Sequence, residues 1–149
     1  MKFIVFSLLL AADSALAVSS NVARSGSLRI SEAQANTSKI GDSTMHFVVT
    51  DANYPDDTPT DCNLIWASNG SPKQSARCNN SQYYIRFPNG GQDIGSFTLE
   101  LERVSGPIPE KGQAVLDRNA PGTKWICVDN PMDGVLKRCN YDGVLEIPV

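Results

Sequence analysis

Apolar and polar residues alternate most regularly in the stretch from Gly95 to Arg103. Phe97, Leu99 and Leu101 occupy every second position there. The positions between them hold Thr98, Glu100 and Glu102. A period of two places the two sets on opposite faces of a β-strand. The pattern predicts one amphipathic strand with a buried apolar face and a solvent-exposed polar face.

Shorter stretches of the same kind predict further strands on both sides of this one. They cover residues 28 to about 32, 44–50, 62–67, 82–87, 111–117, 123–128 and 144–149. Residues typical of turns separate them, and the segments 33–42, 51–61 and 129–134 are predicted to be loops. No stretch shows convincing helical periodicity. The sequence therefore predicts an all-β fold, either a small, mostly antiparallel β-barrel or a sandwich.

The N-terminus has the pattern of a secretory signal peptide. A lysine at position 2 precedes an apolar run, and Ala15-Leu16-Ala17 supplies small residues for cleavage. The apolar run is shorter than the roughly 20 residues that a membrane-spanning helix needs. We therefore expect residues 1–17 to be a signal peptide, residues 18–149 to form a single domain, and the protein to be secreted without a membrane anchor.

Charge gives little support to nucleic acid as a partner. The chain has 13 basic and 16 acidic residues, a formal net charge of −3. The basic residues are scattered singly and are not interleaved with aromatic residues, as they would be on a surface that follows phosphates.

The four cysteines form two local pairs in the sequence. In a secreted chain they are expected to be oxidised. Four cysteines allow three connectivities. We favour Cys62 with Cys78 and Cys127 with Cys139, because each pair closes a short loop. Neither pair has the spacing of a zinc knuckle, and the single histidine, His46, is distant from both in sequence.

These features together resemble the Alternaria major-allergen family of small secreted fungal proteins, which includes elicitors of the plant hypersensitive response. The likeness lies in the signal peptide, the two cysteine pairs, an early strand Leu28-Arg29-Ile30-Ser31-Glu32 and a final strand Val144-Leu145-Glu146-Ile147-Pro148. It implies a compact β-barrel with the same two intramolecular disulfides. It also implies a protein that acts outside the fungal cell, in the host apoplast or the fungal wall, by contact with host proteins. The family's dimer-linking cysteine has no counterpart between Val18 and Asp61, so we expect a monomer or a non-covalent homodimer.

Two loops are candidates for binding a partner protein. One is the acidic segment 51–61, with Asp56 and Asp57, and the other is the segment 129–134, with Met132 and Asp133. Neither has the residue spacing of a calcium loop, and we expect no metal and no cofactor. Three sequons, at Asn36, Asn69 and Asn79, are expected in surface loops as candidate glycosylation sites.

Catalysis has weaker support than binding. A serine triad would have to use His46, but the sequence has no Gly-x-Ser-x-Gly elbow. Glu100 and Glu102 could supply the two carboxylates of a glycosidase, although a solvated polar stripe is the simpler interpretation. We therefore predict a secreted, effector-like protein that binds host extracellular proteins and is not an enzyme. The alternative is a barrel that binds a small apolar ligand, such as a flavonoid or lipid, beside Trp66 and Trp125; core packing of both tryptophans is the simpler expectation.

Overall fold

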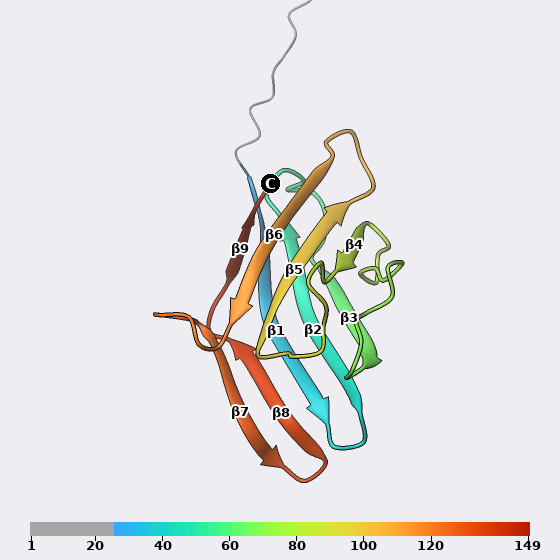
Figure 1. The fold of residues 1–149 in the computed structure, drawn as a ribbon. Coiled ribbons are helices and arrows are strands. Elements are labelled where there is room, and N and C mark those ends of the chain that lie inside the picture. The colour runs from blue at the N-terminus through green and yellow to red at the C-terminus, as the bar shows by residue number, and fades with distance from the viewer. Residues whose placement is uncertain (1–25) are drawn as a thin grey trace, which may run out of the picture.

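The computed structural model describes residues 26–149, which form nine β-strands and no helix (Figure 1). The strands are β1 (Ser27–Ser38), β2 (Asp42–Asp51), β3 (Thr60–Ala67), β4 (Tyr83–Arg86), β5 (Ser96–Arg103), β6 (Glu110–Asp117), β7 (Trp125–Met132), β8 (Val135–Tyr141) and β9 (Leu145–Pro148). The all-β prediction is confirmed. The expected signal peptide, residues 1–17, lies outside the described residues.

The strands form two antiparallel sheets that pack face to face. Sheet A has the order β3-β2-β1-β8-β7, with β9 also paired to β1, and sheet B has the order β4-β5-β6. Figure 1 shows sheet B lying across one face of sheet A. The sheets do not close into a barrel. Of the two predicted architectures the sandwich is therefore the one observed, and the barrel that the family resemblance implies is not.

Strand β1 is much longer than the sequence predicts. The expected loop over residues 33–42 is wrong, because β1 continues to Ser38 and only a short turn separates it from β2. A β-bulge lies between Ser31 and Gln34, where Glu32 has a φ of 56°. The bulge shifts the alternation by one residue, so the next inward side chain after Ile30 is Ala33. This irregular spacing concealed the second half of the strand.

The core lies between the two sheets and contains a row of aromatic rings. Trp66, Phe87, Phe97 and Trp125 follow one another with centroid separations of 5.3, 4.6 and 5.9 Å. The indole N–H of Trp66 donates to the carbonyl of Gly91 at 2.9 Å. Both tryptophans are buried, so the expectation that they pack in the core is confirmed. The row connects both edge strands of sheet A to sheet B.

Strand β5 is correctly predicted, but its second face is not solvated. Thr98 and Glu100 are only 7% and 5% exposed, although they lie on the face away from the core. β5 is the central strand of sheet B, and long side chains from its neighbours cover Glu100. Gln113 Nε2 donates to Glu100 at 2.6 Å, and Lys111 Nζ lies 3.4 Å from it. The prediction of a solvent-exposed polar face is therefore wrong for the middle of this strand.

Both predicted disulfides are confirmed. Cys62 is bonded to Cys78, and Cys127 is bonded to Cys139. The second joins directly opposite residues of β7 and β8. The expected loop over residues 129–134 is wrong, because β7 extends to Met132 and β8 begins at Val135.

Candidate functional site

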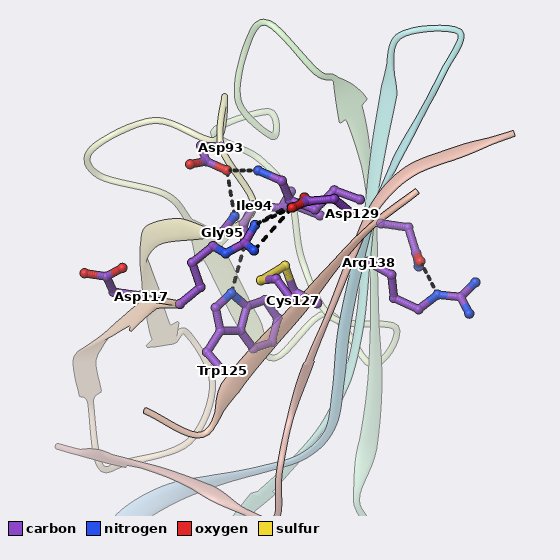
Figure 2. Close-up of a disulfide and its surroundings, with 12 residues drawn as sticks. Asp93, Ile94, Gly95, Asp117, Trp125, Cys127, Asp129 and Arg138 are labelled. Atoms are coloured by element: carbon purple, nitrogen blue, oxygen red, sulfur yellow. Dashed lines mark hydrogen bonds and ion pairs between the residues drawn. A yellow bond between two sulfur atoms is a disulfide. The ribbon is translucent and has the colours of Figure 1, made fainter. Parts of the chain in front are cut away.

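The hairpin formed by β7 and β8 is fixed to the rest of the protein along its inner side. Trp125 Nε1 donates to the carbonyl of Ile94 at 2.9 Å (Figure 2). Arg118 Nη1 lies 3.2 Å from the Asp129 carboxylate, and Lys137 Nζ lies 2.8 Å from that of Asp93. These contacts, with the disulfide between them, hold the hairpin rigidly against the loops of sheet B.

The charge of Asp93 is itself stabilised. Partial burial acts to raise the pKa of Asp93, but the hydrogen bonds from Lys137 and from the backbone of Gly95 lower it overall. Asp93 therefore remains an anion and a lasting partner for Lys137.

The outer side of this hairpin exposes apolar residues. Of the nine large apolar side chains that are exposed in residues 26–149, four lie here: Ile126, Val128, Met132 and Leu136, each 47–53% exposed. We refer to these four as the hairpin patch. Ile126 lies opposite Asn140 and Val128 opposite Arg138, whose guanidinium reaches the sulfur of Met132 at 3.7 Å. Apolar side chains that a rigid scaffold holds in water are typical of a surface that a partner covers.

The two predicted binding loops lie at opposite ends of sheet A. Strand β2 brings Asp51 beside Leu28, at the start of β1, whereas Val135 pairs with Ser38, at the end of β1 (Figure 1). At about 3.3 Å per residue the intervening strand separates the two ends by roughly 30 Å. Residues of the first loop and of the hairpin tip therefore cannot contribute to one small interface.

The four predicted loop residues also differ in what they contact. Asp56 and Asp133 are exposed, and Met132 belongs to the hairpin patch. Asp57 accepts a hydrogen bond from Arg103 Nη2 at 2.7 Å. Asp57 is therefore a structural partner of a buried arginine, and its role in a partner-binding loop stays a prediction.

Arg103 is at the centre of a buried polar group that sequence reasoning missed. We refer to Asp51, Tyr83, Arg103 and Glu110 as the acid–arginine cluster; all four are buried. Arg103 Nη1 lies 3.1 Å from Asp51 Oδ2 and donates to the Tyr83 hydroxyl at 2.7 Å, and Tyr83 donates to the same Asp51 oxygen at 2.9 Å. The cluster connects β2 of sheet A to β4, β5 and β6 of sheet B.

The loop after β2 closes over this cluster. Arg103 stacks on the ring of Tyr54, with its guanidinium carbon 3.4 Å from the ring centroid. The hydroxyl of Tyr54 accepts from the amide of Ile108 at 2.8 Å and lies 3.0 Å from the Ile108 carbonyl oxygen. The cation–π contact and the hydrogen bonds fix the acidic loop in place.

Glu110 is the unusual member of the cluster. Asn53 Nδ2 donates to its Oε1, but Oε2 is buried and no described residue donates to it. Burial, and next its hydrogen bond with the Asp51 carboxyl, raise the pKa of Glu110 to about 7. Burial beside Asp51 therefore favours the protonated form of Glu110.

Tyr83 remains a hydrogen-bond donor in this setting. Burial first, and then the charge of Asp51, raise the pKa of Tyr83. Arg103 therefore forms ion pairs with Asp51 and Asp57, and Tyr83 stays neutral beside them.

The carboxylates proposed for a glycosidase are engaged by cations. Arg86 contacts both Glu100 and Glu102 on the outer face of sheet B. Burial acts to raise the pKa of Glu100, but hydrogen bonds from Gln113 and Lys111 lower it overall. Glycoside hydrolysis needs one carboxyl that retains its proton as the acid, and the lowered pKa of Glu100 does not suit that role.

His46 lies over a hollow of about 430 Å³ on the outer face of sheet A. Its Nδ1 is 3.0 Å from the side-chain oxygen of Asn63, and its Nε2 is 3.8 Å from Glu32 and 3.9 Å from Asp61. Among the described residues no serine hydroxyl is hydrogen-bonded to this ring. The histidine is therefore surrounded by amide and carboxylate groups and not by the parts of a serine triad.

The sequons occupy two kinds of position. Asn69 and Asn79 are exposed in turns, as expected. Asn36 lies within β1, is partly buried and accepts a hydrogen bond from Arg138 Nε at 2.8 Å. The expectation of a surface loop is wrong for Asn36, because the bulge in β1 hid the strand that contains it.

A second hollow, of about 390 Å³, includes Trp125 in its lining. The tryptophan is 1% exposed and its N–H is already bonded to Ile94, so it offers almost no surface to a ligand. This contact gives no specific support to the small-ligand alternative.

Comparison of the chain with protein-family models, with curated proteins and with solved structures gave no match. Residues 26–149 contain no helix long and apolar enough to cross a membrane. Within the same residues, no group of three or more histidine, cysteine, aspartate or glutamate side chains is placed to hold a metal ion.

Proposed function

We propose that this protein is a secreted, effector-like binding protein that acts by recognising a host extracellular protein and not by catalysis. The observation that supports this most directly is the hairpin patch. Its four apolar side chains are half exposed on a hairpin that a disulfide and inner-side contacts hold in one conformation. A rigid surface of this kind loses little conformational entropy when a partner covers it.

Two further features favour the proposal. The disulfides fit a protein that works outside the reducing cytosol, as the resemblance to secreted fungal elicitors also implies. The side chains considered for catalysis, Glu100, Glu102 and His46, are paired with cations or amides. The protein partner would bind at the hairpin patch, with Met132 from the predicted loop included and Asp57 excluded.

The test is a pull-down from plant apoplastic fluid with the oxidised protein and two double variants. Ile126→Ser with Val128→Ser removes the centre of the hairpin patch. Ile65→Ser with Val115→Ser is the matched control, because it removes the same residue types from exposed strand positions elsewhere. The few interface residues whose truncation weakens binding by more than about 1 kcal/mol cluster near the centre of the interface. We therefore expect the first variant to retain roughly tenfold less of the partner, and the control to bind like the unmodified protein.

The comparison separates recognition at the patch from non-specific adhesion. Equal retention by all three proteins, or retention of no protein by any of them, would contradict the proposed function. Thermal unfolding of each variant checks that the fold is kept.

A further inference from the structure

Strand β7 has a free edge, whereas the edges of β4 and β6 are covered and that of β3 is covered in part. Along β4, Ala76 accepts from the amide of Ile85 at 2.9 Å, and the amide of Cys78 donates to Tyr83 at 3.1 Å. The edge of β3 is covered at one end, where the amide of Asn79 donates to Asp61 at 2.8 Å. Strand β6 lies against β9, with Gly112 next to Pro148. β7 pairs with β8 alone, so one side of its backbone faces outward.

The register with β8 identifies the backbone groups on that outward side. The Cα atoms of Cys127 and Cys139 are 4.0 Å apart, the short separation that marks a pair without mutual backbone hydrogen bonds. The amide of Asp142 donates to the carbonyl of Lys124 at 2.8 Å, which makes the pair of residues 124 and 142 a hydrogen-bonded one. Both observations give the same alternation of hydrogen-bonded and non-hydrogen-bonded pairs along β7 and β8. The amides and carbonyls of Ile126 and Val128 therefore bond to β8, and those of Cys127 and Asp129 point to the free edge.

The length of this free edge is limited at both ends. The outward amide of Trp125 is already bonded to the hydroxyl of Thr123 at 3.1 Å. Beyond Asp129, the register shifts, Asn130 has a φ of 50°, and Pro131 has no N–H. In residues 26–149 no side chain or backbone group bonds to the outward amides of Cys127 and Asp129. These two residues form a short template for one further strand.

We propose that the edge of β7 binds an extended segment of the partner protein, which adds to sheet A as an antiparallel strand. This inference rests on the proposed function and specifies how the partner is recognised. Residues of the segment opposite Cys127 and Asp129 exchange backbone hydrogen bonds with them. Residues opposite Ile126 and Val128 are apolar, because their side chains lie on the same outer face as the hairpin patch.

Charge favours a different protein over a second copy of this chain. Asp133 is exposed at the hairpin end of the edge, and the whole chain has a net charge of −3. A second copy would bring another acidic chain against it. A segment with a lysine or arginine beyond its apolar residues complements Asp133, whereas Asp129 is already paired with Arg118.

The register makes a prediction for the free protein. Backbone amide hydrogen exchange should be slow at Ile126 and Val128 and fast at Cys127 and Asp129. Slow exchange at the last two would overturn the assignment of the free edge.

Binding is tested with a synthetic peptide of alternating valine and threonine flanked by lysine. Valine has to face the hairpin patch, so the threonine amides have to face β7. N-methylation of the threonines should weaken binding at least tenfold, and N-methylation of the valines should leave it within about twofold. No binding by the unmodified peptide, or equal effects of the two methylations, would overturn strand addition.

Two substitutions repeat the test from the protein side. Asp129→Pro removes an outward amide that β8 does not use. Asp129→Asn keeps the amide; both variants weaken the contact with Arg118, so the asparagine variant controls for that loss. Only the proline variant should lose the peptide. The apoplastic pull-down separates the two proposals. If the Ile126 and Val128 double variant loses the partner but Asp129→Pro keeps it, the proposed function stands and strand addition is overturned. A dimer in sedimentation that Asp129→Pro converts to a monomer would assign the edge to a second copy and also overturn the proposal.

Discussion

Replacing Glu110 with glutamine should remove a pH dependence of stability that the acid–arginine cluster creates. Glu110 is 3% exposed and faces Asp51 and Asn53, with Arg103 nearby. Burial and the neighbouring Asp51 carboxyl favour the protonated form of Glu110 in the folded protein. A glutamine is uncharged at every pH, and its amide can donate to Asp51 while its oxygen still accepts from Asn53.

The size of the effect follows from the pKa. Burial and Asp51 raise the pKa of Glu110 from 4.5 to about 7 in the folded state. A raised folded-state pKa means that the folded protein binds the proton more tightly than the unfolded chain, so stability is full below about pH 4.5 and is lost as the pH rises through 7. Each pKa unit corresponds to about 1.4 kcal/mol, so the loss approaches about 3 kcal/mol above pH 7. The coupling to Asp51 makes this an upper bound.

The assay is urea unfolding of the oxidised protein between pH 5 and pH 8.5, followed by tryptophan fluorescence. We expect the free energy of unfolding of the unmodified protein to fall across this range, and that of Glu110→Gln to stay flatter and to be higher at pH 8.5. Glu146→Gln is the control, because it removes a glutamate that is 63% exposed on β9. Parallel pH profiles for the unmodified protein and Glu110→Gln would refute the raised pKa of Glu110 in the folded protein.

Two other predictions concern single contacts. Asp57→Asn should lower the free energy of unfolding by about 1 to 2 kcal/mol, because it weakens a charged hydrogen bond to Arg103. The control, Asp56→Asn, should change the free energy of unfolding by less than about 0.5 kcal/mol. Equal effects of the two variants in urea unfolding would contradict the roles assigned to the two aspartates. The double variant Cys127→Ala with Cys139→Ala should lower the free energy of unfolding in urea by about 3 kcal/mol, since it opens a short cross-linked loop. An unchanged free energy of unfolding would show that the inner-side contacts alone hold the hairpin.

Two charged residues of the acid–arginine cluster continue the alternation of buried positions along their strands. Phe97, Leu99 and Leu101 point to the core, and Arg103 is the next residue with the same parity. Asp51 likewise continues the alternation of β2. If the period of two is continued by one more position in each strand, it predicts that Arg103 and Asp51 are buried. That they meet could not be read from the sequence, because they are 52 residues apart and lie in different sheets.

The polar face of β5 was mispredicted for a different reason. A period of two assigns side chains to faces, but it does not say what covers a face. Glu100 is buried by side chains of β4 and β6, and these strands become its neighbours only when sheet B assembles. Three strands with long charged and amide side chains are enough to remove this carboxylate from water. The simple assumption of one buried and one solvated face therefore failed at the central strand.

The free edge of β7 follows from the order of strands in sheet A. Up to Ile30, β1 pairs with β9, and from Gln34 onward it pairs with β8. Because β8 and β9 occupy successive parts of the same side of β1, the hairpin extends past the end of β9 (Figure 1). No strand follows β7 in the sheet. The sequence predicts the strand at 123–128 but not its position at an edge, because the choice of neighbouring strands is made only when sheet A assembles. The surface proposed for recognition therefore depends on the strand order of the sheet as well as on the apolar residues of the hairpin.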